Sequence, residues 1–270
     1  MRGGLRPYPA QKFRMTHIVI IEANTPDMSP AAVAFADVFA MLDPDVSVTV
    51  CKPYVNQLTA VNFADCDGIV MTGSGVAWST DAPQGAQQRA AAELAFATGR
   101  PVWGSCNGMQ LAATVLGGAV GASPNGIEVG VARNTRRTDA AHPMFAGRGD
   151  TWSVPCIHRD EVQRLPDGAV LTATNDHSSI QAFAYTNNGV DFWGTQYHPE
   201  LTTKQIADFM RDPTRIFSDH THMIPDLDNA ETDTDAAGRL GTTPQALSFE
   251  HRTRELANWL AHVKSQKART

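Results

Sequence analysis

One short stretch constrains the fold of this chain more than any other: a cysteine set among small residues, between an apolar run and a helix-like run. Residues 104–108 are Gly-Ser-Cys-Asn-Gly, with the apolar run 101–103 before them and the helix-like run 109–116 after them. This order predicts a tight strand-to-helix turn, in which side chains in place of the two glycines would collide with neighbouring strands. Cys106 would then lie at a helix N-terminus, where unpaired N–H groups and the helix dipole favour a thiolate. The pattern indicates a nucleophile, and a plain buried cysteine is the alternative.

A second element, later in the chain, supplies groups that could activate such a cysteine. The apolar strand-like segment 192–197 is followed by His198, and Glu200 comes two places further on. Residues two apart in an extended segment point to the same face, so these two side chains can act together. A nucleophile needs an adjacent base, and the base needs a third group that fixes its tautomer and stabilises its charged form. Cys106, His198 and Glu200 fit these roles, although a structural histidine before a proline turn is the alternative for His198.

Three motifs, in this order, resemble the class I (triad) glutamine amidotransferases, most closely their GMP-synthetase-like branch. The motifs are Gly-Ser-Cys-Asn-Gly-Met-Gln at 104–110, Ile-His-Arg-Asp-Glu-Val at 157–162 with Leu-Pro-Asp-Gly at 165–168, and Gly-Thr-Gln-Tyr-His-Pro-Glu at 194–200. The resemblance covers roughly residues 16–201, and the last helix is expected to match as well.

The resemblance implies an activity and the residues that perform it. Cys106 is the expected nucleophile, His198 the general base and acid, and Glu200 the orienting carboxylate. The implied reaction is the hydrolysis of a γ-glutamyl amide bond through a glutamyl thioester, which releases ammonia and glutamate when glutamine is the substrate. No metal or other cofactor is expected to take part.

The resemblance also implies residues that bind the substrate. Gln110, in the helix that Cys106 opens, matches a position that helps to hold the glutamyl group. The loop of His158, Arg159 and Asp160 matches a segment that lines the same pocket.

The loop at residues 72–75 departs from the family pattern. Family members usually have a Gly-Gly-Pro turn there, and one of its backbone N–H groups helps to form the oxyanion hole, whereas this chain has Thr-Gly-Ser-Gly. A backbone donor requires no particular side chain, so the N–H groups of Ser74 and Asn107 are expected to form the hole, with Gly73 beside the substrate. The missing proline predicts a less rigid turn.

The rest of the chain alternates strand-like and helix-like segments, which predicts an α/β fold with a three-layer, flavodoxin-like, mostly parallel sheet. The expected strands of the first half are 17–22, 46–51, 68–71 and 101–103, and the expected helices are 30–41 and 84–98. Shorter strands at 127–133, 151–157, 169–174, 180–185 and 191–197 predict an antiparallel extension, with a hairpin turn at 187–189. Sites in such sheets lie at the carboxyl ends of strands, where Gly73 and Cys106 both fall.

The chain divides into four expected parts. Residues 1–15 are a flexible leader, in which Met15 could be the true start, and residues 16–211 are the amidotransferase-like domain. Residues 212–243 contain an acidic stretch, poor in apolar residues, that predicts a mobile loop or insertion. Residues 244–270 predict a C-terminal amphipathic helix that packs on the core. Its expected apolar stripe is Leu247, Leu256, Trp259, Leu260 and Val263. The alternative for this extension is a cap over the active site or a self-association surface.

Charge and composition narrow the classes of partner. A net charge of −6 and a pI near 5.8, without a basic stripe, argue against nucleic acid. The sequence contains no run of about 18 apolar residues, so a membrane span is not expected. The four cysteines lie far apart without metal-ligand spacing, which favours a reducing, cytoplasmic compartment and no metal site.

The motifs leave the substrate and the partner open. In the family, glutamine hydrolysis is usually coupled to a synthetase domain that consumes the ammonia, so a separate synthetase subunit is one expectation. A free-standing hydrolase that cleaves γ-glutamyl amides, peptides or conjugates would use the same triad. A non-catalytic binding or regulatory module is the third interpretation, and a homo-oligomer remains open for all three.

Overall fold

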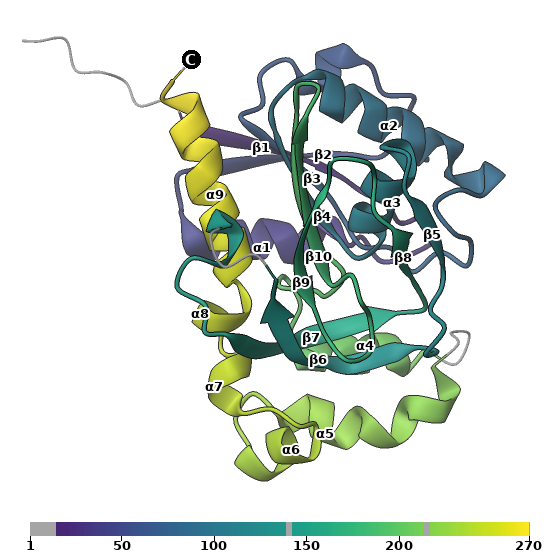
Figure 1. Cartoon of the computed structure of the whole chain (residues 1–270), viewed down its shortest axis with the longest axis vertical. Helices are drawn as coiled ribbons and strands as arrows, with labels where there is room; N and C mark the ends of the chain where they lie inside the picture. Colours follow the sequence, from purple (N-terminus) through teal and green to yellow (C-terminus); the bar gives the residue numbers. More distant parts are fainter. Residues whose placement is uncertain (1–14, 139–141, 213–216, 270) are drawn as a thin grey trace, which may run out of the picture.

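A large central sheet covered by helices on both faces forms the body of the molecule (Figure 1). The computed structural model describes residues 15–138, 142–212 and 217–269. The strands of the sheet, in spatial order, are β2 (Val46–Cys51), β1 (Thr16–Ile21), β3 (Gly68–Met71), β4 (Pro101–Ser105), β11 (Val190–Thr195), β10 (Ala182–Asn187), β9 (Val170–Thr174), β6 (Glu128–Arg137) and β7 (Thr151–His158). A small second sheet pairs β5 (Ala119–Ala122) with β8 (Asp160–Arg164). The α-helices are α1 (Ala32–Leu42), α2 (Ala86–Ala97), α3 (Asn107–Val115), α4 (Thr203–Met210), α5 (Ile224–Asn229), α6 (Thr234–Arg239), α7 (Pro244–Leu247), α8 (Phe249–Arg252) and α9 (Arg254–Lys267).

The sheet is parallel from β2 to β11 and antiparallel beyond. The order β2-β1-β3-β4, followed by β11 as the fifth parallel strand, is that of flavodoxin-like folds. From β11 onward, β10, β9, β6 and β7 pair antiparallel. The predicted α/β class, with its antiparallel extension, is therefore confirmed. The two short strands β5 and β8 were not predicted.

The hairpin between β10 and β11 forms where the sequence predicts it. Asn188 and Gly189 have φ angles of 52° and 79°, the left-handed values that a two-residue hairpin turn of type I′ requires. This turn returns the chain along β11 beside β4, the strand that ends just before Cys106.

The two helical layers follow from the alternation of side chains along the buried strands. In β1, Ile18 and Ile20 pack in the core beneath α1 and α9, whereas Val19 and Ile21 pack beneath α2 and α3. Figure 1 shows α1 and α9 on one side of the sheet and α2 and α3 on the other. Trp259 of α9 anchors the first layer, because its side chain is fully buried. The apolar side chains on both faces of the sheet thus fix β3, β4 and β11 in place. The candidate site lies at the carboxyl ends of these three strands.

The acidic segment differs from the predicted mobile loop. Its described part contains a 3-10 helix (Ser218–Met223) and the helices α5 and α6. Leu227 and Leu240 from this segment are buried in a cluster with Val129 and Val131 of β6. Asp233 caps α6 by accepting hydrogen bonds from two backbone N–H groups. A few buried apolar side chains and local helix caps are enough to form helices in an otherwise polar stretch. The average polarity of the segment therefore predicted a loop where the structure has short helices.

The expected C-terminal helix is interrupted. Ser248, with ψ of 154°, is extended and separates α7 from α8, and α9 begins only at Arg254. The predicted apolar stripe is correct, because all five of its residues are buried. Residues 1–14 of the expected leader lie outside the described residues. Among the helices that the structure describes, none combines the length and the apolar character needed to cross a membrane.

Candidate active site

A strained turn presents Cys106 between β4 and α3. Cys106 has φ of 48° and ψ of −108°, a conformation that is rare for residues other than glycine. Its backbone N–H donates to the Thr195 carbonyl at 2.7 Å, which ties the turn to the neighbouring strand β11. A Cβ atom at Gly104 would lie 2.7 Å from the Gly108 carbonyl carbon, and one at Gly108 would lie 2.2 Å from the Met71 carbonyl oxygen. The glycines are therefore required by close approach of the backbone.

His198 and Glu200 lie beside this turn because of strand register. Ser105 of β4 stands opposite Thr195 of β11 in a parallel pair, so the residues that follow each strand emerge at the same edge of the sheet. The His198 backbone N–H donates to the Pro155 carbonyl at 2.9 Å. Its Nδ1 lies 2.6 Å from Glu200 Oε1, and both side chains are buried. This pairing orients the ring so that Nε2 is left for another partner.

The Cys106 thiol lies between His198 and the end of β7. Its Sγ donates a long hydrogen bond of 3.6 Å to the Ile157 carbonyl, and the sulfur also interacts with the His198 ring. Among the described residues, His198 Nε2 has no partner in hydrogen-bonding geometry, so the sulfur is close to the ring without being aligned with it. Because Nε2 is unengaged, it is available to exchange a proton with the sulfur or with a bound substrate.

The electrostatics of this group favour a charged imidazole. Burial, the largest single influence, disfavours the charged ring, but the interactions of the ring with the Glu200 carboxylate and with the Cys106 sulfur outweigh it. Together they raise the pKa of His198 to about 10. An imidazolium beside the sulfur is the form that stabilises a thiolate and can protonate a leaving amine.

Ser105 is a further residue of the site that was not expected from the sequence. Its Oγ donates to Glu200 Oε2 at 3.0 Å and accepts from Trp103 Nε1 at 2.9 Å. Both oxygens of the buried Glu200 carboxylate are thus engaged, one by His198 and one by Ser105. The signal was present in the sequence: a serine two places after a tryptophan in a buried strand shares its face.

The loop expected to form the oxyanion hole packs on the histidine. A Cβ atom at Gly73 would lie 2.7 Å from His198 Cε1. The Ser74 side chain turns away from the site, because its Oγ donates to the Ala23 carbonyl at 2.9 Å and to Asn24 Oδ1 at 3.0 Å. Among the described residues, no hydrogen-bond partner is found for the Ser74 backbone N–H. Its amide is therefore available to a substrate oxygen.

Asn24 holds this loop, although no sequence motif marks it. Its Oδ1 accepts from the Ser74 hydroxyl and from the Gly75 backbone N–H, the latter at 2.9 Å. Its own Nδ2 donates to the Ser29 carbonyl at 2.7 Å. These bonds fix the turn from the side chain of another loop, where family members are expected to use a proline within the turn itself.

Gln110 is brought next to the predicted substrate loop. Its backbone N–H donates to the Cys106 carbonyl, which places it one helical turn beyond the cysteine. Its Nε2 donates to the Asp160 carbonyl at 2.6 Å and to Gln196 Oε1 at 3.1 Å. Gln110 thus joins α3, β8 and the end of β11 behind the cysteine.

The three residues of the predicted loop have different surroundings. Arg159 donates to the Ala77 carbonyl at 2.8 Å and forms two hydrogen bonds with the Asp160 carboxylate. These hydrogen bonds from Arg159 lower the pKa of Asp160, against the effect of burial. His158 instead points to the buried carboxylate of Glu128, 2.8 Å from its Nε2. The segment that joins β7 to β8 is therefore held in place by the Arg159–Asp160 ion pair and by the hydrogen bond between His158 and Glu128.

Glu128 is a further residue that the sequence did not reveal. Besides contacting His158, it accepts from Asn175 Nδ2 at 2.6 Å and from Gln181 Nε2 at 2.7 Å. Burial alone would raise the pKa of Glu128, but the hydrogen bonds and the nearby histidine charge lower it below its usual value. The carboxylate fixes His158 in place, and no local sequence pattern connects these four residues.

Comparison with known proteins decides the family of the chain. Residues 38–212 match the family model described as glutamine amidotransferase class-I. The chain belongs to this family. In the part of this amidotransferase that the structure describes, no group of three or more metal-ligating His, Cys, Asp or Glu side chains occurs.

Two relatives and one solved structure show how far the similarity extends. A γ-glutamyl-L-1-hydroxyisopropylamide hydrolase from Pseudomonas sp is 35% identical over 218 residues, which cover 73% of this amidotransferase and 72% of the relative. A glutamine-hydrolyzing GMP synthase subunit from Natronomonas pharaonis is 35% identical over 144 residues, which cover 53% of this chain and 71% of the relative. A glutamine amidotransferase from Thermotoga maritima shares the fold, with a TM-score of 0.63 and 20% identity over 92% of this chain and 98% of that one.

Proposed function

We propose that this class I glutamine amidotransferase hydrolyses γ-glutamyl amide bonds through a thioester on Cys106. The observation that carries the proposal is the arrangement of three side chains. Cys106 lies on a strained turn against the His198 ring, and Glu200 holds the opposite ring nitrogen at 2.6 Å. A nucleophile, a base and an orienting carboxylate are the parts that covalent amide hydrolysis requires.

In the first step the Cys106 thiolate attacks the side-chain carbonyl carbon of the γ-glutamyl group. The carbonyl oxygen becomes negative and accepts hydrogen bonds from the backbone N–H groups of Ser74 and Asn107. The imidazolium of His198 gives its proton to the amide nitrogen as the C–N bond breaks, so ammonia or a larger amine leaves. The enzyme then holds the glutamyl group as a thioester, and His198 is neutral.

In the second step water attacks the thioester. Neutral His198 takes a proton from the water as the C–O bond forms, and the oxyanion again lies against the two backbone donors. Collapse of this intermediate releases glutamate and returns Cys106 as a thiolate beside an imidazolium. Glu200 keeps its charge throughout and stabilises the charged ring in both steps.

The leaving amine separates two candidate activities. Glutamine as substrate gives ammonia, and a separate synthetase subunit would consume it; similarity to a glutamine-hydrolyzing GMP synthase subunit supports this candidate. A secondary γ-glutamyl amide as substrate gives a free amine, with no partner required. The relative named as a γ-glutamyl-L-1-hydroxyisopropylamide hydrolase covers more of the chain and favours this second candidate.

A substrate panel distinguishes the two activities. The purified chain is assayed with glutamine, γ-glutamyl alkylamides, γ-glutamyl peptides and a γ-glutamyl anilide, and the released glutamate is measured. Turnover of the alkylamides or peptides well above that of glutamine supports the free-standing hydrolase. Turnover of glutamine that rises when the synthetase partner is added supports the amidotransferase.

The Cys106→Ala variant serves as the matched control. It removes only the sulfur from a buried position, so the fold is expected to persist and all turnover to disappear. Glutamate release by this variant at the wild-type rate with every substrate would overturn the proposal. If the folded wild-type chain hydrolyses none of the panel and its Cys106 is inert, the protein is a binding module.

A further inference from the structure

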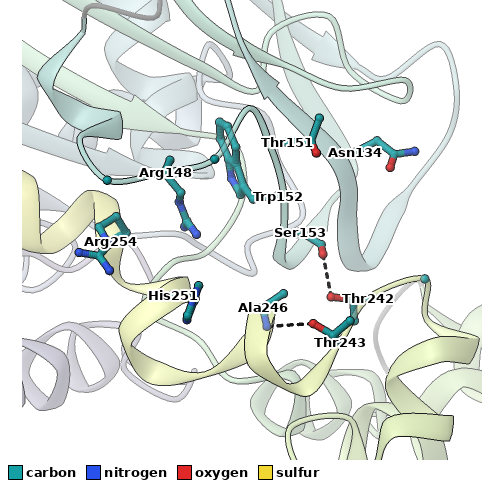
Figure 2. Close-up of a pocket in the computed structure, with 13 residues that line it drawn as sticks. Asn134, Arg148, Thr151, Trp152, Ser153, Thr242, Thr243, Ala246, His251 and Arg254 are labelled. Atoms are coloured by element: carbon teal, nitrogen blue, oxygen red, sulfur yellow. Dashed lines mark hydrogen bonds between the residues drawn. The ribbon is translucent and has the colours of Figure 1, made fainter.

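A cavity lies at the opposite end of β7 from Cys106. It has a volume of about 450 Å³ and opens between the start of β7 and the C-terminal helices (Figure 2). Its lining residues are Asn134, Gly147, Arg148, Gly149, Thr151, Trp152, Ser153, Gly241, Thr242, Thr243, Ala246, His251 and Arg254. The lining residues from Asn134 to Ser153 form one wall and lie within the segment that matches the family model, whereas those from Gly241 to Arg254 belong to the C-terminal extension. The extension therefore completes a cavity of the size that holds a small molecule.

The side chains that line the cavity are basic or neutral, and none is acidic. They offer two arginines, a histidine, four hydroxyl groups and an asparagine amide. This bias stands out because acidic residues outnumber basic ones in the whole chain, by 28 to 22. Cationic groups and hydrogen-bond donors are the surroundings that an anion requires, and the carboxylates that pair with the two arginines, Glu255 and Glu250, lie outside the lining.

Arg148 is the strongest single feature of the cavity. Its side chain is only 5% exposed, and its Nε and Nη2 donate to the buried Glu255 at 2.9 and 2.7 Å. Tyr197 donates to the same carboxylate at 2.9 Å, so both Glu255 oxygens are already engaged. Among the described residues, Arg148 Nη1 has no hydrogen-bond partner. Figure 2 shows the guanidinium directed from one wall toward His251 on the other.

The second arginine, Arg254, is also available to a ligand. Its partner Glu250 is 76% exposed, and an exposed ion pair of this kind contributes little energy. A Cβ atom at Gly147 would lie 3.6 Å from Arg254 Nη1, so the guanidinium lies against the loop that forms the other wall. Arg148 and Arg254 thus approach the cavity from the two halves of the chain.

The cavity is held open by bonds that do not involve a ligand. The hydroxyl groups of Ser153 and Thr242 are 2.7 Å apart and join the two walls. Asn258 Nδ2 donates to the Met144 and Ala146 carbonyls at 2.8 and 3.0 Å and fixes the loop that leads to Arg148. Thr243 caps α7 by accepting from the Ala246 backbone N–H. A preformed site loses less entropy when a ligand binds.

We propose that this cavity is a binding site for a small phosphate-bearing metabolite, separate from the catalytic centre. A tetrahedral dianion accepts hydrogen bonds in several directions at once, which suits a cavity whose two walls each carry one guanidinium group and two hydroxyl groups. The phosphate lies between Arg148 and Arg254, and the remaining volume takes the organic part of the ligand. The proposal is independent of the proposed reaction, since neither Cys106 nor His198 lines the cavity.

Calorimetric titration with inorganic phosphate, pyrophosphate and ribose 5-phosphate tests the proposal. Two variants alter the cavity without touching the buried Arg148–Glu255 pair: Arg254→Gln removes a charge, and Ala246→Phe fills space. Arg164→Gln is the matched control, because it removes a charge from an exposed arginine on β8 that does not line the cavity. Thermal melting verifies that each variant is folded.

The expected result is binding to the wild type and to the control with equal affinity. Arg254→Gln is expected to weaken binding about tenfold or more, since a charge-assisted hydrogen bond is lost. Ala246→Phe is expected to weaken binding of ribose 5-phosphate at least as strongly, and it decides the question if Arg254→Gln does not fold. The proposal is overturned if no probe binds at about 1 mM, or if both cavity variants bind as the wild type does.

Discussion

Replacement of Glu200 by glutamine tests how the carboxylate acts on His198. Glutamine has nearly the same shape, and its carbonyl oxygen can still accept the hydrogen bond that Nδ1 donates, so the ring keeps its orientation. What is lost is a negative charge 2.6 Å from the ring, in a pair whose side chains are 6% and 3% exposed. The variant therefore separates charge from geometry.

The size and sign of the effect follow from the structure. An opposite charge at such a distance stabilises the charged form by about 1 to 3 pKa units. The pKa of His198, raised to about 10 in the intact site, is expected to fall by that amount. Since the imidazolium is the form that protonates the leaving amine, activity is lost as pH rises through this pKa. The alkaline limb of the pH profile therefore moves to lower pH in the variant.

The assay is kcat/KM for the best γ-glutamyl substrate, measured between about pH 6 and pH 11, because this ratio reports groups of the free enzyme. Glu93→Gln, which removes one charge from an exposed position on α2, is the control and is expected to leave the profile unchanged. An alkaline limb that stays where it is in the wild type would refute the reasoning, for Glu200 would then not set the charge of His198.

Three further substitutions test parts of the site. Ser105→Ala removes a hydrogen bond to the buried Glu200 carboxylate, so it is expected to lower the free energy of unfolding by about 1.5 to 3 kcal/mol; an unchanged denaturant midpoint contradicts the assigned contact. Gly108→Ala brings a methyl group to 2.2 Å from a carbonyl oxygen of β3 and is expected to destabilise by about 1 to 3 kcal/mol or more. Gly238→Ala, in helix α6 with nothing within 4 Å, is its control and is expected to leave stability unchanged or to raise it by up to about 1 kcal/mol. Equal stability of both variants is the contrary outcome. Asn24→Ala releases the turn that carries the Ser74 amide and is expected to lower kcat about tenfold with little change in the melting temperature; full kcat would show that the turn holds itself.

The parts of the fold predicted from sequence are those with a local cause. Buried parallel strands have apolar, β-branched runs that can be recognised in the sequence. The turn at Asn188 and Gly189 needs residues that adopt left-handed backbone angles, and the Asn-Gly pair marks it in the sequence. The acidic segment was misread because its helices depend on a few side chains, such as Leu227 and Leu240, that pack against distant strands. The pairing of β5 with β8 likewise depends on segments far apart in the chain.

The residues of the candidate site likewise fall into those that a local motif predicts and those that depend on contacts between distant segments. Cys106, His198 and Glu200 were predicted because each lies in a motif with its own turn or strand signal, and the register of β4 with β11 explains why they meet. Asn24 and Glu128 were missed because they act across 50 and 30 residues on Ser74 and His158, where no spacing rule applies. Such contacts are fixed by the tertiary structure and leave no local signal in the sequence.

The central claim is that Cys106 is the group that takes up the glutamyl moiety. Burial raises the pKa of the thiols of Cys51 and Cys156, and that of Cys66 to about 11, so these thiols are poor nucleophiles. Treatment with a chloroketone analogue of glutamine, followed by mass measurement of the intact protein and of its peptides, tests this most directly. The account predicts one adduct, on Cys106, that forms much more slowly in a His198→Ala variant. An adduct on another cysteine, or none on Cys106 in the folded protein, would contradict it.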